Sequence, residues 1–168
     1  EDSLLATGED WLFWNQNMDY GERESDKNAE GVFKKFFKGI AQVHPAARIL
    51  DVASGNLFIA KLAKRVSSGF QVHAIDTAPI RKNEIEGSGG IKVHRLSVED
   101  LRAFPNGYFD AVASKFGLGY SDWNVSLEEL NRILSEDGKI CLIAHSPDSF
   151  VVENMKKFVE ASLLINQL

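Results

Sequence analysis

Hydrophobic and polar residues alternate with two different periods along the chain, and these periods predict strands that alternate with helices. Short β-prone runs bounded by turn residues predict five strands, at 48–52, 70–76, 91–96, 108–114 and 139–144. Apolar residues at helical spacing predict helices at 29–43, 57–66, 79–90, 126–137 and 148–165. Strands joined to helices by short loops are typical of a parallel sheet with helices on both faces. The pattern therefore predicts a three-layer α/β sandwich.

The first 30 residues follow a less regular pattern than the rest. Thr7 and Asp10 have the spacing of a capping box ahead of the aromatic run 11–14, which predicts a short helix there. We therefore expect a helical cap segment, residues 1–30, in front of the main part, residues 31–168, of a single domain. Two roles stay open for its rings: packing against the domain, or covering a pocket with Trp14 or Tyr20.

Composition and charge narrow the classes of function. A hydrophobic content of 44% in 168 residues is enough for one core. The formal net charge of −5 and the pI of about 5.4 argue against binding to nucleic acid or to an anionic membrane. No apolar run approaches the roughly 20 residues of a membrane span, and the acidic start is unlike a signal peptide. The one cysteine, Cys141, is expected as a buried strand thiol in a reducing, cytoplasmic setting.

Small and polar residues follow several of the predicted strands. The first strand ends at Ala53, Ser54 and Gly55, whose small side chains let backbone N–H groups approach a ligand closely. Asp76 ends the second strand, where dinucleotide folds place an acid that binds ribose. Ligands bind at the carboxyl ends of strands in such sheets, so a site is expected there. His73, inside the second strand, is expected as a strand residue with a satisfied ring rather than a metal ligand.

Five motifs follow one another along roughly residues 29–146, and they are Ile49–Gly55, Asp76, Glu99–Leu101, Phe109–Val112 and Leu127–Leu134. In this order they resemble the motifs of the class I S-adenosylmethionine-dependent methyltransferases. The sequence Phe116-Gly117-Leu118 is similar to that of the branch with the ubiquinone and menaquinone C-methyltransferases. The resemblance implies that 31–168 is a methyltransferase-like domain with a mainly parallel, Rossmann-like sheet in the strand order 3-2-1-4-5.

The resemblance also implies a role for each matching residue. Asp51, Ala53, Ser54 and Gly55 match the motif whose backbone approaches the methionine and ribose parts of the cofactor. Asp76, followed by Thr77, matches the acid that binds both ribose hydroxyls. The residues expected around the adenine are Ser97, Val98 and Glu99, and those beside the amino-acid moiety are Lys115 and Phe116. The implied product is S-adenosylhomocysteine.

The chain departs from the family pattern in four respects. The family has glycine where this chain has Ala53 and Leu57, and usually an acid where it has Ser97. Ala53 is expected to fit with a negative φ, and Leu57 to point into the interface between helix and sheet. The last two family strands have no counterpart, so the domain is either shortened or completed by another chain. An uncovered sheet edge would allow a homodimer.

Methyl transfer from a sulfonium mainly requires positioning, desolvation and an aimed nucleophile, so few catalytic side chains are expected. His145 is the best-placed general base, with Tyr120 and Asp122 behind it. The expected acceptor is a small molecule, with Trp14, Tyr20 and Tyr120 as substrate residues.

Two other classes of function stay open beside the enzyme. The first is a methyltransferase-like fold without catalysis that serves as a binding or partner subunit. The second is a nicotinamide-dependent oxidoreductase, but that class requires Gly-x-Gly-x-x-Gly after the first strand, and only Gly55 stands there.

Overall fold

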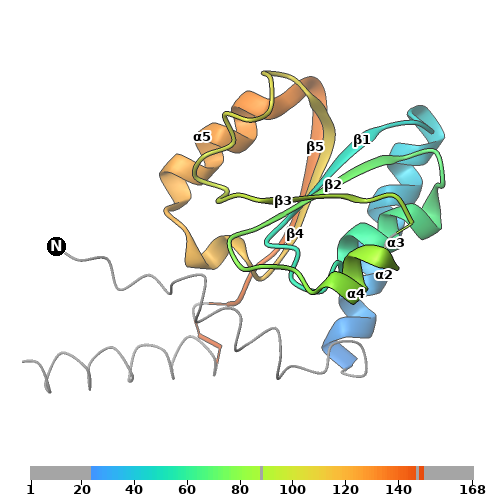
Figure 1. The fold of residues 1–168 in the computed structure, drawn as a ribbon, viewed down its shortest axis with the longest axis horizontal. Helices are drawn as coiled ribbons and strands as arrows, with labels where there is room; N and C mark the ends of the chain where they lie inside the picture. Colours follow the sequence, from blue (N-terminus) through green and yellow to red (C-terminus); the bar gives the residue numbers. More distant parts are fainter. Residues whose placement is uncertain (1–23, 88, 147, 150–168) are drawn as a thin grey trace, which may run out of the picture.

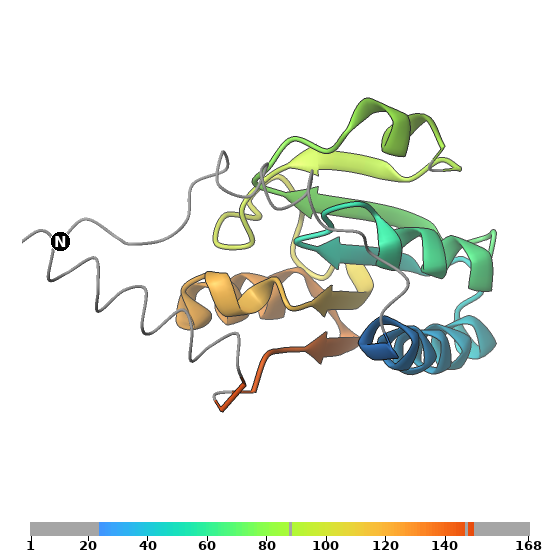
Figure 2. The ribbon, with the colours of Figure 1, turned by 90° about the horizontal axis from the view of Figure 1, so that it is seen from below.

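The computed structural model describes residues 24–87, 89–146 and 148–149, and they form one parallel sheet covered on both faces (Figure 1). The strand order is β3-β2-β1-β4-β5, as predicted. The bounds of the strands are β1 Arg48–Val52, β2 Gln71–Asp76, β3 Lys92–Arg95, β4 Phe109–Lys115 and β5 Leu134–Ile143. All neighbouring pairs are parallel, so the carboxyl ends meet at one edge, as the arrowheads in Figure 2 show.

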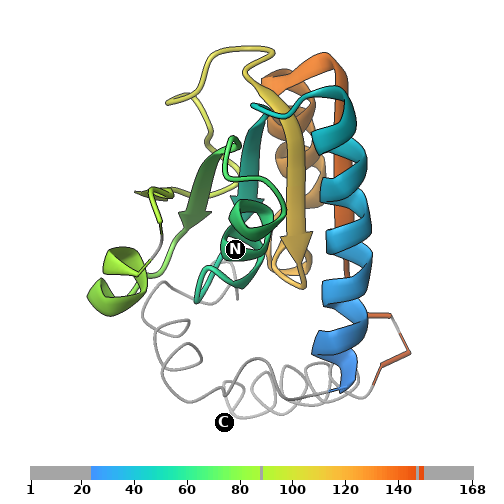
Figure 3. The ribbon, with the colours of Figure 1, turned by 90° about the vertical axis from the view of Figure 1, so that its right-hand side faces the viewer.

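Helices lie on both faces of the sheet. Helices α2 (Glu24–Val43) and α3 (Phe58–Val66) lie on one side, and α5 (Trp123–Ile133) lies on the other (Figure 1). Figure 3 shows α2 running along the strands. The short helix α4 (Lys82–Glu86) belongs to the connection between β2 and β3, and the single 3₁₀ turn η1 (Leu118–Tyr120) follows β4. This arrangement confirms the three-layer α/β fold.

Two apolar cores lie on opposite faces of the sheet. The first packs α2 and α3 against the strands, with Phe33 and Phe37 fully buried beside Ile49. The second packs α5 and the loop 96–108 against the other face, and it contains Leu50 and Leu130. Because β1 sends alternate side chains into both cores, four of its five residues are buried.

The sequence prediction of where the helix after β4 begins is wrong. Ser126 and Glu129 do not form a capping box, because Asp122 is the N-cap and its side chain accepts hydrogen bonds from Asn124 N at 2.9 Å and Val125 N at 3.3 Å. Ser126 is buried inside α5. The helix ends at Ile133, and β5 begins at once with an irregular pairing to β4.

Other boundaries differ less from the sequence prediction. Helix α2 begins at Glu24 instead of Ala29, and only Lys82–Glu86 of the predicted helix 79–90 is helical. Cys141 is half-buried rather than buried. The predicted helices at 7–14 and 148–165, with Trp14 and Tyr20, lie outside the described residues, and the division at residue 30 stays a prediction. In the described part of the chain, no helix is both long and apolar enough to cross a membrane.

Candidate cofactor-binding site

The turn between β1 and α3 has a left-handed backbone at three residues. The φ angles are 54° at Ala53, 50° at Gly55 and 64° at Leu57. The expectation of a negative φ at Ala53 is therefore wrong, because this turn bends as if glycine were present. Leu57 is fully buried in the first core, which confirms that it points between helix and sheet. Each non-glycine residue in this conformation costs about 1–2 kcal/mol.

Asp51 lies directly beneath this turn. Its side chain is 1% exposed, and Oδ2 accepts a hydrogen bond from Ala60 N at 2.9 Å, in the first turn of α3. The residue at the N-cap, Leu57, has no side chain that could satisfy this amide. Asp51 therefore caps α3 from the neighbouring strand, which fixes the helix relative to the turn.

Asp76 joins the end of β2 to the same turn. Its Oδ2 accepts a hydrogen bond from Gly55 N at 2.8 Å, and its Oδ1 accepts one from Ala78 N at 2.9 Å. The register pairs Asp51 with Ala74, so both carboxyl groups lie toward the carboxyl edge of the sheet. Each oxygen of Asp76 keeps a second acceptor position, which two ribose hydroxyls could fill.

The carboxyl groups of Asp51 and Asp76 have no positive charge of a described residue to balance them. Burial raises the pKa of Asp51 to about 8, the Ala60 N–H group opposes this, and the nearby Asp76 adds to it. Burial also raises the pKa of Asp76, against the N–H groups of Gly55, Ala78 and Thr77. Neither carboxyl group forms an ion pair with a residue that the structure describes. A cationic ligand would therefore be favoured here.

Ser54 supplies a further unsatisfied group at this turn. Its backbone N–H donates to Ile75 O at 3.0 Å, but its buried Oγ has no hydrogen-bond partner among the described residues. Buried hydroxyls normally have a partner, so a polar ligand group would complete this site. The residues after β1 and β2 thus fit a ligand that carries hydroxyl groups and positive charge.

The loop after β3 carries the residues predicted around the adenine. Ser97 Oγ accepts a hydrogen bond from Glu99 N at 3.2 Å, which closes a tight turn. Val98 is 9% exposed and packs into the second core. Glu99 Oε1 in turn accepts a hydrogen bond from Asp122 N at 2.8 Å. The loop is therefore tied to the start of α5.

An aromatic cluster follows β4 and β5. The rings of Phe116 and His145 are stacked, with centroids 4.2 Å apart and 11° between their planes, and Tyr120 lies edge-on to His145 at 6.5 Å. Lys115 Nζ lies 5.6 Å from the centroid of the Phe116 ring. Burial lowers the pKa of His145, which favours the neutral imidazole that a general base requires.

This cluster lies against the turn after β1. A Cβ atom placed on Gly117 would lie 2.1 Å from the Cβ of Ala53, so only glycine fits there. The structure therefore brings together the predicted residues from the ends of β1, β2, β4 and β5.

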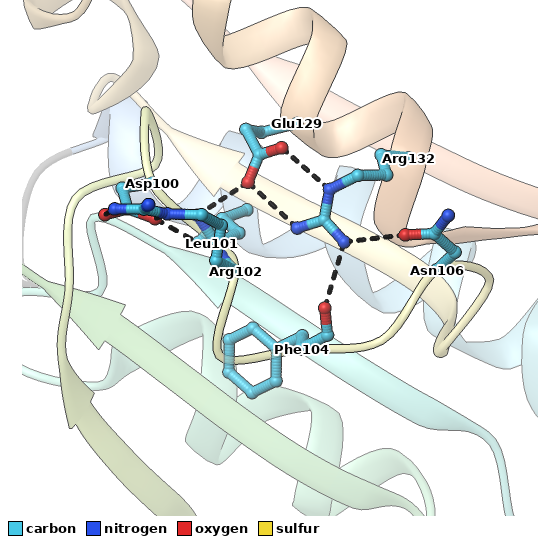
Figure 4. A network of polar contacts seen from close by, with 7 residues as sticks. All are labelled: Asp100, Leu101, Arg102, Phe104, Asn106, Glu129 and Arg132. Carbon is cyan, nitrogen blue, oxygen red and sulfur yellow. Dashed lines mark hydrogen bonds and ion pairs between the residues drawn. The ribbon is translucent and has the colours of Figure 1, made fainter.

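Sequence reasoning missed two sets of contacts. The first is an ion-pair network of α5 with the loop 96–108, shown in Figure 4. The second is a pair of stacked histidines, in which His73 Nδ1 lies 3.0 Å from His94 Nε2. His73 Nε2 has no partner in the described part of the chain, so the expectation of a fully satisfied ring is wrong. Among those residues, no three His, Cys, Asp or Glu side chains form a group that could hold a metal.

A surface hollow of about 430 Å³ lies between this loop and α5. Its lining residues are Glu99, Asp100, Arg102, Val125, Glu128 and Glu129. It shares Glu99 with the segment predicted around the adenine, and it shares no residue with the ends of β1, β2 and β4.

The sheet order, the small-residue turn after β1 and the acid that ends β2 define a Rossmann-like, nucleotide-binding type of protein. A family described as a methyltransferase domain matches residues 50–142, more than half of the chain. The chain therefore belongs to the class I S-adenosylmethionine-dependent methyltransferases, as its motifs indicated, and S-adenosylmethionine is the cofactor of this family.

Individual relatives agree with this family. A "demethylmenaquinone methyltransferase" of Thermus thermophilus is 34% identical over 106 residues, which cover 60% of this chain and 48% of the relative. A "ubiquinone/menaquinone biosynthesis C-methyltransferase" of Bordetella parapertussis is 29% identical over 121 residues, which cover 68% and 47%. The matches thus span about half the length of these relatives.

A solved structure shares the fold. It is a putative sarcosine dimethylglycine methyltransferase from Galdieria sulphuraria, with a TM-score of 0.63 and 17% identity over 80% of this chain and 58% of that one.

Proposed function

We propose that this chain binds S-adenosylmethionine over the β1 turn and takes part in transferring its methyl group to a small molecule. The observation that carries the proposal is the pair of buried carboxyl groups, Asp51 and Asp76, which no cation of the described residues compensates. Asp76 would bind the ribose hydroxyls with its free acceptor positions. The positive charge of the bound cofactor would favour the ionised form of Asp51, and Ser54 Oγ would gain the partner that it lacks.

Bound S-adenosylmethionine would supply an electrophilic methyl group, whose bonding electrons stay on the sulfur when S-adenosylhomocysteine is formed. The residues of this chain would orient the reactants and exclude water, since in-line displacement needs little else. His145 would accept the proton that the acceptor loses. Its ring is held for this role by stacking on Phe116.

The acceptor that this site favours is a planar aromatic ring. Phe116, Tyr120 and His145 present ring faces and edges at the ends of β4 and β5. The relatives' names refer to quinone biosynthesis, so we propose an aromatic ring of the quinol type as acceptor. Trp14 and Tyr20 stay predictions for the same pocket.

Calorimetric titration with S-adenosylmethionine tests the cofactor site. The wild type should bind, and Asp76→Ala should weaken binding about 100-fold, because two hydrogen bonds to a charged group are lost. Asp137→Asn, an exposed residue of β5, is the matched control and should bind like the wild type. Absence of heat from the folded wild type would contradict the proposal, and binding of NAD would favour an oxidoreductase.

A second candidate function is a methyltransferase-like binding or partner subunit without catalysis. The left-handed, non-glycine residues Ala53 and Leu57 favour it, because strain in this turn could hold the cofactor away from its productive position. Methyl transfer to a quinol, followed by mass spectrometry, separates the two: binding without a methylated product supports the subunit.

We further propose a cytoplasmic location and a homodimer through β5. Among the described strands β5 is an edge, and Ile140 on it is 39% exposed. Sedimentation of the wild type and of Ile140→Lys tests this: a monomeric wild type would contradict it.

A further inference from the structure

The loop 96–108 begins beside Asp76, whose backbone carbonyl accepts a hydrogen bond from Leu96 N at 3.1 Å. The next residues, Ser97 and Val98, belong to no helix or strand. Their positions therefore depend on whatever holds the loop. Helix α5 supplies such a support, because it contacts the loop through the network drawn in Figure 4.

Glu129 holds the first half of the loop. Its Oε2 accepts a hydrogen bond from Leu101 N at 2.7 Å. The same carboxylate forms a bidentate pair with Arg132, at 2.7 Å to Nε and 2.9 Å to Nη2. The two side chains are only 17% and 27% exposed, respectively. A bidentate, half-buried pair fixes the direction of the carboxylate, and hence the position of the Leu101 amide.

Arg132 holds the second half of the loop. Its Nη1 donates to Phe104 O at 3.0 Å and to Asn106 Oδ1 at 2.9 Å, and its backbone carbonyl accepts from Gly107 N at 2.9 Å. The planar guanidinium donates to four acceptor atoms at once, whereas a lysine in its place would have only three N–H donors. Glu129 and Arg132 together thus hydrogen-bond to the loop at Leu101, Phe104, Asn106 and Gly107.

The support continues from Leu101 to the predicted adenine residues. Asp100 N donates to Ser97 O at 3.2 Å, and Glu99 N donates to Ser97 Oγ at 3.2 Å, so 97–100 is one closed turn. Leu101 is fully buried and anchors this turn in the second core. A shift of the Leu101 amide would therefore move Ser97.

We propose that Glu129 and Arg132 form a positioning pair that sets the selectivity of the site for adenine, by fixing the Ser97 turn from α5. This inference rests on the proposed function, because it assigns Ser97 to the adenine.

The same loop offers a matched control. Arg102 binds Asp100 at 2.8 Å and 2.7 Å, also in a bidentate manner. This pair is 84% and 50% exposed, and the guanidinium donates to no other residue in the described part of the chain. Arg102→Gln should therefore leave the turn unchanged, since exposed pairs contribute little.

Two measurements on the wild type, Glu129→Gln, Arg132→Lys and Arg102→Gln test the pair. The first is amide exchange of Leu101 by NMR without ligand. This exchange should be about tenfold faster in Glu129→Gln and Arg132→Lys than in the wild type, and it should be unchanged in Arg102→Gln. The second is the affinity for S-adenosylhomocysteine and for its analogue without the 6-amino group. The wild type and Arg102→Gln should prefer the amino compound about tenfold, and Glu129→Gln and Arg132→Lys should show a ratio close to one.

The outcomes separate this inference from the proposed function. If the wild type binds neither compound, both fail. If it binds both compounds and Glu129→Gln keeps the wild-type ratio although Leu101 exchanges faster, the positioning role alone is overturned. A wild-type ratio of one overturns it as well. Arg132→Lys keeps the test valid should Glu129→Gln fail to fold.

Discussion

The turn after β1 and the loop after β3 lie at the same edge of the sheet, but they are built in opposite ways. In the turn, Asp51 and Asp76 are buried without a counter-ion among the described residues, and Ala53 and Leu57 have left-handed backbones. At the loop, the Leu101 amide donates to the carboxylate of Glu129 on α5, which is also paired with the guanidinium of Arg132. Strain and poorly compensated carboxyl groups reduce stability, and they are typical of sites shaped for a ligand. The contrast separates a strained turn from a loop that α5 supports.

The largest expected effect comes from Gly117→Ala. Its new Cβ would lie 2.1 Å from the Cβ of Ala53, so the β4 exit and the turn must move apart. We expect the free energy of unfolding to fall by about 3 kcal/mol in urea denaturation.

The double variant Ala53→Gly, Gly117→Ala should recover most of that loss. It removes the clashing methyl group, and the next atoms lie 3.4 Å away. An equal loss in the single and double variants would show that the turn does not depend on this contact.

A smaller effect is expected from Asp51→Asn. The pKa of Asp51 is raised from 3.8 to about 8, so the folded protein holds a proton that the unfolded chain has released. Its contribution to stability is complete below 3.8 and is lost as pH rises through about 8. The wild type should lose about 2 kcal/mol of unfolding free energy between about pH 6 and pH 8.

Asp51→Asn keeps an oxygen for Ala60 N–H and should flatten this slope, because the group no longer ionises. Asp76 titrates in the same direction, so some slope should remain. Urea denaturation at both pH values gives the comparison, and an unchanged slope would place the proton elsewhere. The variant should bind S-adenosylmethionine more weakly while its fold is more stable at the higher pH.

The smallest effect is expected from Ala53→Gly. Glycine removes the strain energy of the left-handed backbone, and it also makes the unfolded chain more flexible, which lowers stability. The first contribution should be the larger, so the free energy of unfolding should rise by about 0.5 kcal/mol. Ala103→Gly is the control, because Ala103 is exposed and has no positive φ. This control should lose about 0.5–1 kcal/mol. Thermal unfolding of both variants measures the difference, and equal losses would mean that the turn is not strained.

The fold was largely predictable because its strands are short apolar runs with clear turn residues between them. Strand β1 was predicted with its observed bounds, since both its faces are buried and Ala53 and Gly55 end the run. The start of α5 was not. Ser126 and Glu129 have the spacing of a capping box, but the helix begins earlier, where the Asp122 side chain accepts hydrogen bonds from the amides of Asn124 and Val125.

Only those parts of the site that depend on residues close together in the sequence could be predicted. The acids at 51 and 76 stand at strand ends, so their common edge followed from the parallel sheet. The left-handed backbone of Ala53 could not be predicted, because packing against Gly117, which lies far along the chain, shapes that turn. The partner of Glu129 at Leu101 is likewise a contact between distant segments, which no local pattern encodes.

Asp76 has a consequence for how a ligand would arrive. Its side chain is already held by Gly55 N and Ala78 N before anything binds. A sugar that binds here would therefore not have to immobilise the Asp76 side chain, because two backbone amides already fix its orientation. The entropic cost of ordering this side chain falls on folding rather than on binding.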